Sequence, residues 1–563
     1  MERPVDITRR DFIGKGAAAG VGTLAALYSP AILAQPRFDL VILGGVVLDG
    51  TGTPPFPGDI GIVGDRIVAL GRIPREQGAR VIDASSQHVA PGFIDIHTHS
   101  DGDILEYPTA DSRVRQGVTT EVTGNCGGSA APLSRERPAE SLQSPAQEGR
   151  EPRWTGVASY CDYLDRFGIS VNHAQLIGQG TLRRNAVGLV DRPLAADELD
   201  HVLRAVDEGM AEGAFGLSTG LEYVPGRYTP TDEIVAMARI AARHGGFYAS
   251  HIRNEEIHVL EAVDEAITIG RQAGCRVEIS HLKATGRGNW AKQQGALDLI
   301  EAARRGGVAV LADAYPYTAY STGLTILLPA DTLEGGTPAM LGRLADPSTR
   351  AAIRSHLVTQ VSQDPGDFSL IVIARMKADE DQALVGQSVA RIAELWRLDP
   401  AETIIRLIEK EQGNVPFIGH GMSAENVERV LAHPLVMVGS DGYSMAPTGR
   451  AARSRPHPRS YGTFARVLGY YCRDRRLFSL AEAVRKMTSM PADQVGLRDR
   501  GRIAAGKAAD LVVFDPATVK DEATFDTPHR FATGIRHVLV NGVPVVENGE
   551  HTGAKPGRAL RRT

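Results

Sequence analysis

Eight short apolar runs recur through the centre of the chain, and stretches of helical periodicity separate them. Each run has the length and composition of a buried strand. Strands that alternate with helices form βα units on a parallel sheet, and eight such units favour an α/β fold of the closed (β/α)8 TIM-barrel type over residues 92–496. A doubly wound open sheet is the alternative, but no glycine-rich dinucleotide turn supports it. The expected strands are residues 93–97, 118–122, 173–177, 214–218, 246–251, 276–281, 308–315 and 436–440.

Short β-rich segments flank this centre on both sides. Residues 36–91 and residues 497–550 contain alternating apolar runs with tight turns such as Asn541-Gly542. We therefore expect one discontinuous, small β-sandwich domain built from both ends of the mature chain, followed by residues 551–563 as a C-terminal tail. The centre is longer than the ~250 residues of a bare barrel. The excess falls mainly at about residues 318–400, which predicts an inserted lid subdomain.

The first 35 residues are typical of a targeting signal. Arg9-Arg10 precede an apolar run rich in Ala and Gly at residues 16–33, which is the pattern of a twin-arginine signal peptide. A membrane anchor is the alternative, but the run is short and Pro30 breaks it. We therefore expect export to the periplasm or the extracellular space, without a stable membrane anchor.

Composition and charge give no case for a nucleic-acid or membrane partner. The formal net charge is −5 over 563 residues, so no basic excess predicts binding to nucleic acid or to an anionic membrane. The four cysteines are widely spaced and form no disulfide framework. The sequence carries no pattern from which the oligomeric state can be predicted.

Potential metal ligands or bases follow five of the eight expected strands. His97 and His99 are two residues apart on a strand, so their side chains project from the same face. The strands of a barrel end on one face, where residues far apart in sequence meet. Imidazole and thiolate ligands suit Zn²⁺, and a catalytic site keeps one position open for water. The candidate ligands are His97, His99, Cys126, His251, His281 and Asp441.

These residues resemble the motifs of the amidohydrolase superfamily. The shared features are His97-Thr98-His99 after an apolar strand, single histidines on strands five and six, Asp441 after strand eight, and the flanking β segments. Within the superfamily the chain resembles the N-acyl-D-amino-acid deacylases, or D-aminoacylases. Many hydantoinases, dihydroorotases and phosphotriesterases bridge two metals with a lysine from strand four, whereas residues 214–218 contain no lysine. The deacylases use a cysteine at the end of strand two, which is the position of Cys126.

The resemblance implies one tight Zn²⁺ site and a second, weakly occupied position. Cys126, His251 and His281 would hold the tight ion. The two histidines of the first strand and Asp441 would line the second position. Asp441 would also act as general acid and base on a metal-activated water.

The resemblance also implies a substrate class. Lys283, Tyr315 and Arg459 would bind the substrate carboxylate through an ammonium, a neutral hydroxyl donor and a guanidinium fork. The reaction would split the amide bond of an N-acyl-D-amino acid into a carboxylate and a free D-amino acid. Residues 218–223 resemble the family as well, without an assigned role. The preferred D-side chain and acyl group are not readable from the sequence.

Two rival functions compete with this interpretation. A cyclic amidase of the hydantoinase or dihydroorotase type, or a dipeptidase, would use the same metal chemistry with a different pocket. The missing lysine on strand four counts against many of these enzymes. A non-enzymatic binding protein is disfavoured because every candidate ligand position is filled.

Overall fold

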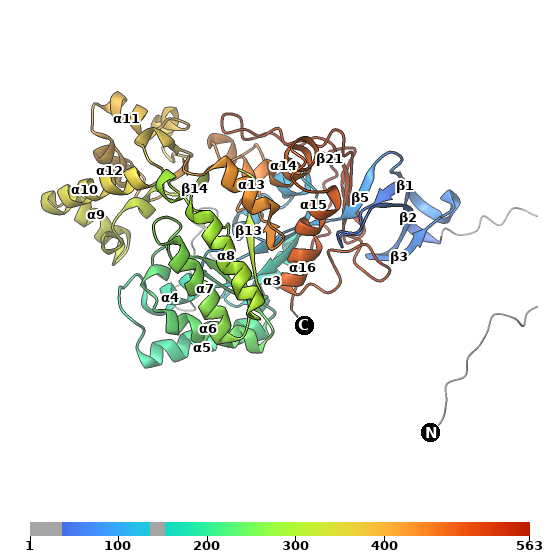
Figure 1. The fold of residues 1–563 in the computed structure, drawn as a ribbon, viewed down its shortest axis with the longest axis horizontal. Helices are drawn as coiled ribbons and strands as arrows, with labels where there is room; N and C mark the ends of the chain where they lie inside the picture. The colour runs from blue at the N-terminus through green and yellow to red at the C-terminus, as the bar shows by residue number, and fades with distance from the viewer. Residues whose placement is uncertain (1–36, 135–152, 563) are drawn as a thin grey trace, which may run out of the picture.

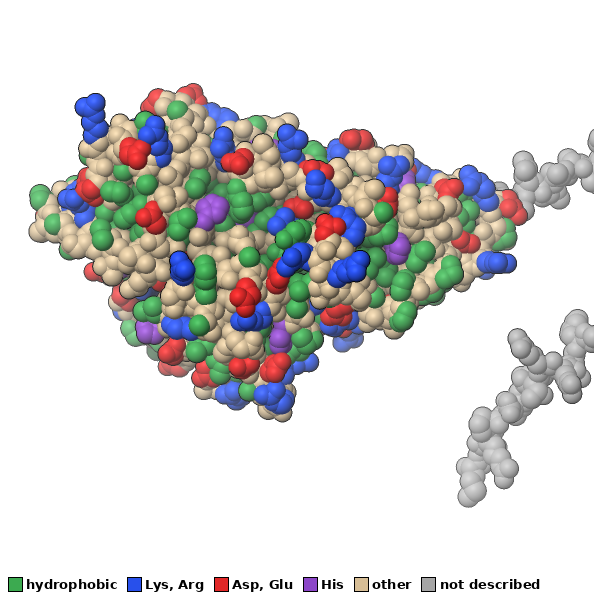
Figure 2. All heavy atoms as spheres, turned by 45° about the horizontal axis from the view of Figure 1, so that its top comes forward, with side chains coloured by type: hydrophobic (Ala, Val, Ile, Leu, Met, Phe, Trp, Pro, Cys, Tyr) green, Lys and Arg blue, Asp and Glu red, His purple; other side chains and the backbone are tan. Residues whose placement is uncertain are grey.

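The computed structural model describes residues 37–134 and 153–562 of the chain. The expected signal segment, residues 1–35, lies outside these residues. Within them, no helix is long and apolar enough to cross a membrane. Cationic and anionic side chains are interspersed over the face drawn in Figure 2, as the small net charge leads one to expect.

A parallel barrel occupies the centre of the molecule. All eight expected strands are present, and the third is divided at Leu176 into two short pieces that pair with different neighbours. The strands run in the order of the sequence, in two hydrogen-bonded groups. The first group is β6 (Phe93–Asp95), β7 (Val118–Thr123) and β8 (Asn172–Gln175). The second group is β9 (Ile177–Gly178), β10 (Gly216–Gly220), β11 (Phe247–His251), β12 (Arg276–Ile279), β13 (Val310–Ala314) and β17 (Val436–Val438).

The ring closes where the first strand meets the last. A parallel bridge joins Thr98 to Gly442 just beyond β6 and β17. The peptide N–H of Asp441 donates to the carbonyl oxygen of His97 at 2.8 Å, and that of His99 donates to the carbonyl oxygen of Gly442 at 2.9 Å. Apolar side chains such as Ile94 fill the interior. The TIM-barrel expectation is therefore confirmed, and the open-sheet alternative is wrong.

Helices cover the outside of the barrel, side by side in chain order (Figure 1). Each buries one stripe of apolar residues, as α6 does at 3.6-residue spacing through Ile234, Met237, Ala238 and Ala241. The stripe packs on the strands, and the opposite face remains polar. Helix α5 (Ala196–Ala211) precedes the fourth strand. The helices that follow the fourth, fifth and sixth strands are α6 (Thr231–Arg243), α7 (Val259–Ala273) and α8 (Lys292–Arg305).

One nine-stranded sheet unites a segment before the barrel, residues 38–91, with a segment after it, residues 511–551. Its centre is the antiparallel pairing of β5 with β18, in which Pro91 lies opposite Leu511. Strands far apart in the sheet, such as β3 with Ile67 and β19 with Leu539, bury side chains in the same core, so the sheet curves around that core. The strands are β1 (Phe38–Val47), β2 (Phe56–Val63), β3 (Arg66–Gly71), β4 (Gly78–Asp83), β5 (His88–Pro91), β18 (Leu511–Phe514), β19 (Ile535–Val540), β20 (Val543–Glu547) and β21 (Glu550–His551).

An inserted subdomain follows the seventh barrel strand and projects from one side of the molecule (Figure 1). Its own apolar core contains Leu357, Ile404 and Phe417. It continues to β16, beyond the expected end near residue 400, because β16 is the middle strand of its antiparallel sheet. The elements are β14 (Tyr320–Gly323), α9 (Thr337–Ala345), α10 (Pro347–Gln363), β15 (Ile371–Ile373), α11 (Val389–Trp396), α12 (Pro400–Lys410) and β16 (Pro416–Gly419).

The C-terminal tail lies along the barrel. Gly557 forms an antiparallel bridge with Ile169, and Ala559 forms a parallel bridge with His173 of β8. The peptide N–H of Leu560 donates to the carbonyl oxygen of His173 at 2.7 Å. The tail therefore runs beside β8 through isolated bridges, without forming a regular strand.

Candidate metal centre

The structure brings all six candidate ligands together at the carboxyl ends of the barrel strands. Three of them, Cys126, His281 and Asp441, have φ values of 51°, 35° and 52°. This left-handed region is uncommon for residues other than glycine and costs on the order of 1–3 kcal/mol per residue. Such strain concentrates at functional sites. Here it occurs at three turns that carry candidate ligands.

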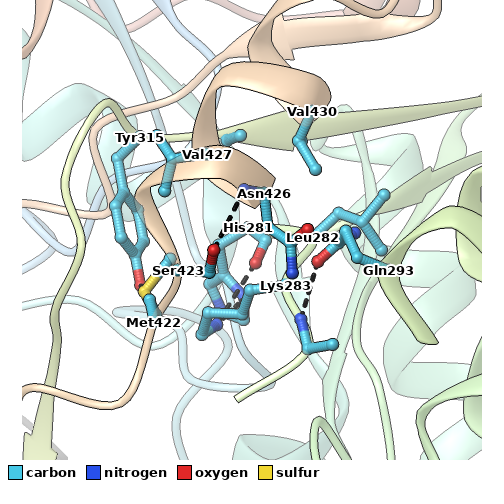
Figure 3. Close-up of a pocket in the computed structure, with 12 residues that line it drawn as sticks. His281, Leu282, Lys283, Gln293, Tyr315, Met422, Ser423, Asn426, Val427 and Val430 are labelled. Atoms are coloured by element: carbon cyan, nitrogen blue, oxygen red, sulfur yellow. Dashed lines mark hydrogen bonds between the residues drawn. The ribbon is translucent and has the colours of Figure 1, made fainter. Parts of the chain in front are cut away.

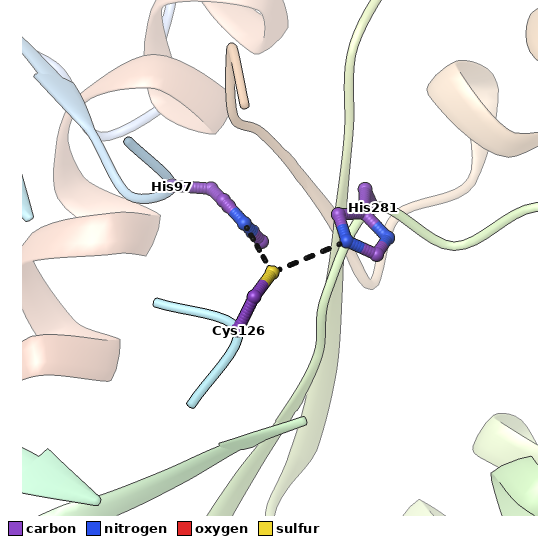
Figure 4. Close-up of side chains that lie close together, drawn as sticks. All are labelled: His97, Cys126 and His281. Carbon is purple, nitrogen blue, oxygen red and sulfur yellow. Dashed lines mark hydrogen bonds between the residues drawn. The ribbon is translucent and has the colours of Figure 1, made fainter. Parts of the chain in front are cut away.

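The Cys126 sulfur lies in the middle of three imidazoles. Its Sγ is 3.3 Å from His97 Nε2, 3.5 Å from His281 Nε2 and 3.7 Å from His251 Nδ1. Figure 4 shows Cys126 between His97 and His281. Ordinary Zn–S and Zn–N bond lengths with a tetrahedral angle place sulfur and nitrogen about 3.6 Å apart. The residues therefore fit a zinc ion without a change of fold.

The charge state of Cys126 also suits a metal ion. Burial alone would raise the pKa of the Cys126 thiol, but His97 and His281 beside it outweigh burial and hold that pKa well below its usual range. The thiolate is the form that binds metal. The expected tight site at Cys126, His251 and His281 thus has both the donor distances and the charge that it needs.

His97 lies between the two expected metal positions. Its Nε2 is 3.3 Å from Cys126 Sγ and 3.7 Å from Asp441 Oδ1. His99 Nε2 is 2.9 Å from the same Asp441 oxygen. The second expected group, His97, His99 and Asp441, is therefore present and adjoins the first group through His97.

Each of the three imidazoles around Cys126 has a carboxylate at its far nitrogen. Asp313 Oδ2 lies 3.2 Å from His97 Nδ1. Glu222 Oε2 lies 3.1 Å from His251 Nε2, and Glu255 Oε1 lies 2.9 Å from His281 Nδ1. A carboxylate accepts a hydrogen bond from the imidazole nitrogen that carries the proton. The other nitrogen of the same ring therefore presents its lone pair to the centre. We call Asp313, Glu222 and Glu255 the outer carboxylates.

The sequence interpretation missed the outer carboxylates. Glu222 belongs to residues 218–223, the segment without an assigned role, and follows the fourth barrel strand directly. Its Oε1 also accepts the peptide N–H of Glu255 at 3.0 Å. The rule that strand ends converge applies to acids as well as histidines, and a search for acids near strand ends would have found Glu222 and Asp313.

Lys283, Tyr315 and Arg459 flank the cluster on one side. The Arg459 guanidinium carbon lies 4.9 Å from the centre of the Tyr315 ring, and the Lys283 Nζ lies 5.8 Å from it. Figure 3 shows Lys283 next to His281, with Tyr315 on the far side of the pocket. Both cations have acidic partners: Lys283 Nζ donates to Glu255 Oε1 at 2.6 Å, and Arg459 Nη1 lies 2.8 Å from Asp441 Oδ2.

Asp441 is thereby held as a carboxylate. Burial would raise its pKa, but Arg459 and the hydrogen bond from His99 keep the pKa well below its usual range. Lys283 likewise keeps its charge, because Glu255 opposes the effect of burial and raises the pKa of the ammonium above its usual range.

Besides the small pocket of Figure 3, two larger cavities reach the cluster. The wider one, about 600 Å³, touches Cys126 and Asp441 and is walled on one side by the insertion through Thr322. The smaller one, about 120 Å³, also reaches Asp441 and lies between the insertion and the loops after the barrel strands. Thr322 donates a hydrogen bond to the Tyr223 hydroxyl at 3.1 Å. The insertion therefore contacts the ring that lies against His251.

A closed barrel with this cluster at its strand ends defines a hydrolase of the metal-dependent barrel class. The chain belongs to the amidohydrolase family, whose model matches residues 80–546. The expected superfamily resemblance is confirmed.

Named relatives cover nearly the whole chain. It is 39% identical over 530 residues to the D-aminoacylase of Alcaligenes xylosoxydans xylosoxydans, a match that spans 94% of this chain and 98% of that protein. It is 38% identical to the N-acyl-D-glutamate deacylase of the same organism, over 94% of this chain and 97% of that protein. The solved structure of N-acyl-D-glutamate deacylase from Bordetella bronchiseptica, complexed with zinc and a phosphonate inhibitor, matches with a TM-score of 0.80. That match has 35% identity and covers 93% of this chain and 100% of that one.

Proposed function

We propose that this protein is a zinc-dependent N-acyl-D-amino-acid deacylase. The observation that carries the proposal is the Cys126 sulfur among three imidazoles, with Arg459 and Lys283 beside the same cluster. The thiolate and imidazoles supply a metal site, and the two cations supply a site for a substrate carboxylate. The relatives named as D-aminoacylase and N-acyl-D-glutamate deacylase support the same reaction.

The tight zinc site is assigned to Cys126, His251 and His281. His97 adjoins this site, and His99 with Asp441 completes a second, weaker position. When bound, zinc supplies a Lewis acid that polarises the amide carbonyl and acidifies a water molecule. The outer carboxylates fix the histidine nitrogens that face the centre, which prepares the site before the ion arrives.

Asp441 is assigned as the general acid and base. As a carboxylate it accepts a proton from the attacking water and then returns that proton to the leaving amine. Its Oδ1 accepts from His99, which orients the group over the cluster. Burial from bulk water limits the escape of the proton between the two steps.

The substrate carboxylate is assigned to Arg459, Lys283 and Tyr315. Arg459 presents a guanidinium fork, which matches a carboxylate in two hydrogen bonds. Lys283 adds a second positive charge next to His281. In the free protein Arg459 forms an ion pair with Asp441, and Lys283 forms one with Glu255. The substrate carboxylate would bind these two cations while both ion pairs remain.

We also propose that the protein is exported by the twin-arginine route to the periplasm or the extracellular space. Arg9-Arg10 and the apolar run after them support this proposal. Cell fractionation of the wild-type chain and of an Arg9→Lys, Arg10→Lys double variant tests it. Loss of the exported fraction in the variant is expected, and equal distribution of both forms would contradict export by this route.

Turnover by the zinc-loaded full chain tests the deacylase proposal. N-acetyl-D-methionine, its L-isomer and a hydantoin are the substrates, and zinc content is measured on the same samples. We expect release of D-methionine and stoichiometric zinc at the tight site. Exclusive activity on the L-isomer, or ring opening without deacylation, would overturn the proposal in favour of a dipeptidase or a cyclic amidase.

A further inference from the structure

Arg184 is a cation in the wide cavity that has no acidic partner among residues 37–134 and 153–562. It lies on α4 (Gln179–Val187) and lines the cavity that reaches Cys126 and Asp441. Its Nε is buried and has no hydrogen-bond partner in the part of the chain that the structure describes. Burial lowers the pKa of Arg184, and no nearby carboxylate among residues 37–134 and 153–562 opposes this effect. Arg184 is half-buried, and a cation that is partly removed from water without a counter-ion is costly unless a ligand supplies one.

The neighbouring arginine shows the contrast. Arg183 is fully buried, lies 3.3 Å from Glu233 through Nη1 and donates to the carbonyl oxygen of Val190 at 3.4 Å. Arg183 therefore has a structural role between α4 and α6. Arg184 has no such contacts in the described part of the chain, so packing does not account for its charge.

The acids on the wall of the same cavity are already engaged. Asp441 pairs with Arg459, and Asp103 pairs with Arg450 at 2.7 Å. Asp101 accepts two peptide N–H groups, from Gly124 and Ala130, at 3.2 Å each. None of these carboxylates forms an ion pair with Arg184, which leaves its charge for a ligand.

The position of Arg184 is tied to the metal centre. The peptide N–H of Thr181 donates to the carbonyl oxygen of Gly127, next to Cys126, at 3.0 Å. The peptide N–H of Ser129 donates to Thr181 Oγ1 at 2.9 Å. Arg184 follows Thr181 by one turn of the same helix, which places the two residues on one side of it. The loop that carries Cys126 thus sets where the guanidinium lies.

We propose that Arg184 binds a second carboxylate of the substrate, so that the preferred substrates are N-acyl-D-amino acids with two negative charges. This inference rests on the proposed deacylase function. The first carboxylate is the one assigned to Arg459, Lys283 and Tyr315. The second belongs to an acidic D-side chain or to a dicarboxylic acyl group, and a guanidinium fork suits either.

The smaller cavity has a mixed wall. It carries the acids Glu222, Glu256 and Asp364 and also the cations Arg227, Arg253 and Lys283. Arg253 pairs with Glu265, and Lys283 pairs with Glu255, so these two cations already have acidic partners. Arg184 in the wide cavity has no such partner among the described residues.

Three substrates on the zinc-loaded full chain test this inference. N-acetyl-D-glutamate carries the extra charge on its side chain, N-succinyl-D-leucine carries it on the acyl group, and N-acetyl-D-leucine carries none. They are compared on the wild type, Arg184→Gln, Arg184→Lys and the control Arg204→Gln. Arg204 is an exposed arginine on α5, away from the cavity. Zinc content and Tm are recorded for each variant.

We expect the wild type to prefer at least one of the dianionic substrates. Arg184→Gln should lower kcat/KM for that substrate by about 10- to 100-fold, the range of a lost hydrogen bond to a charged group, mainly through KM. The change for N-acetyl-D-leucine should stay within about 3-fold. Arg184→Lys should restore part of the loss, and Arg204→Gln should match the wild type. A selective loss of kcat/KM with N-acetyl-D-glutamate would place the second carboxylate on the side chain of the substrate. A selective loss with N-succinyl-D-leucine would place it on the acyl group.

Two results would overturn the inference. One is an equal loss on all three substrates, which means that Arg184 supports the fold. The other is a wild type that hydrolyses N-acetyl-D-leucine at least as well as both dianions, a result that does not depend on the folding of any variant. In either case turnover of N-acetyl-D-leucine leaves the deacylase proposal standing, whereas failure with all three substrates and with N-acetyl-D-methionine removes that proposal as well.

Discussion

At the scale of single residues, Asp441 lies between the two proposed metal positions and the proposed site for the substrate carboxylate. One of its oxygens faces His99 and His97, and the other faces Arg459. We have proposed two roles for this residue, as a ligand of the weaker metal position and as the acid and base of the reaction, and these roles are separable. The tight site at Cys126 does not include it, so the two roles predict different outcomes when the charge is removed.

Asp441→Asn should lower kcat by about 10²- to 10⁴-fold, the usual contribution of a positioned acid or base. Zinc at the tight site should remain close to the wild-type content, because Cys126, His251 and His281 are unchanged. Steady-state kinetics and metal analysis on the same preparation check both statements. Activity near that of the wild type would remove Asp441 from the reaction, and loss of all zinc would make it a ligand alone.

Glu222 illustrates how a residue outside the ligand set controls a ligand. It holds the far nitrogen of His251 and so keeps the near nitrogen directed at Cys126. Glu222→Gln should weaken zinc binding by about 10- to 100-fold, the usual effect of losing such a partner. Chelator competition measures the affinity, with Glu261→Gln on the exposed side of α7 as control. Unchanged affinity would show that His251 is oriented by Tyr223 and packing instead.

At the scale of elements, the insertion depends on a strand that comes last in its sequence. The β16 strand lies between β14 and β15, and Phe417 from β16 is fully buried in the core of the insertion. The β14 strand also carries Thr322, which contacts Tyr223 over His251. The stability of the insertion therefore affects the shape of the wide cavity, because β14 belongs to the sheet of the insertion and also contacts Tyr223.

Phe417→Ala should destabilise the insertion by about 3–5 kcal/mol, because it leaves a large cavity in a small core. We expect faster hydrogen exchange across residues 320–419 and a raised KM, with zinc content unchanged, since every ligand lies on the barrel. Val358→Ala is the control, as Val358 is 54% exposed in the same subdomain. Loss of zinc together with the rise in KM would show that the barrel and the insertion fold as one unit.

At the scale of the whole molecule, the first and last described segments of the chain pair with each other or with the barrel. The pairing of β5 with β18 joins the N-terminal and C-terminal segments immediately before the first barrel strand. The last residues then pass beside β8. Contacts this far apart in sequence close long loops, which favours a single cooperative unit over separate folding of the small sheet.

Gly557→Ala tests whether the tail contributes to that unit. A Cβ at position 557 would come within 2.1 Å of the Val171 carbonyl oxygen, which is backbone and cannot turn away. We expect a loss of about 1–3 kcal/mol, the usual cost of overpacking, seen as a lower Tm. Gly342→Ala on α9 is the control, because a Cβ there meets nothing within 4 Å. Equal Tm values for both variants would mean that the tail is dispensable.

The sequence by itself determined the barrel and the ligand types. Strand and helix periodicities are local, so eight apolar runs with amphipathic stretches between them are sufficient to predict eight βα units. A residue at the end of a strand in such a barrel faces the common site whatever its partners are, which is why His97, Cys126, His251 and Asp441 could be chosen without coordinates. Glu222 and Asp313 fell within reach of the same rule and were missed because only histidines, cysteine and one acid were considered.

Only the tertiary structure decided which atoms meet. Cys126 and His281 are separated by more than a hundred residues of chain, and the 3.5 Å between their donor atoms depends on side-chain packing that no local pattern encodes. The same holds for the place of His97 between the two metal positions, for β16 as the middle strand of the insertion and for the tail beside β8. Arg184 shows this most clearly. In the sequence it is the second of two adjacent arginines, and only the fold pairs the first with Glu233 and places the second in the wall of the wide cavity.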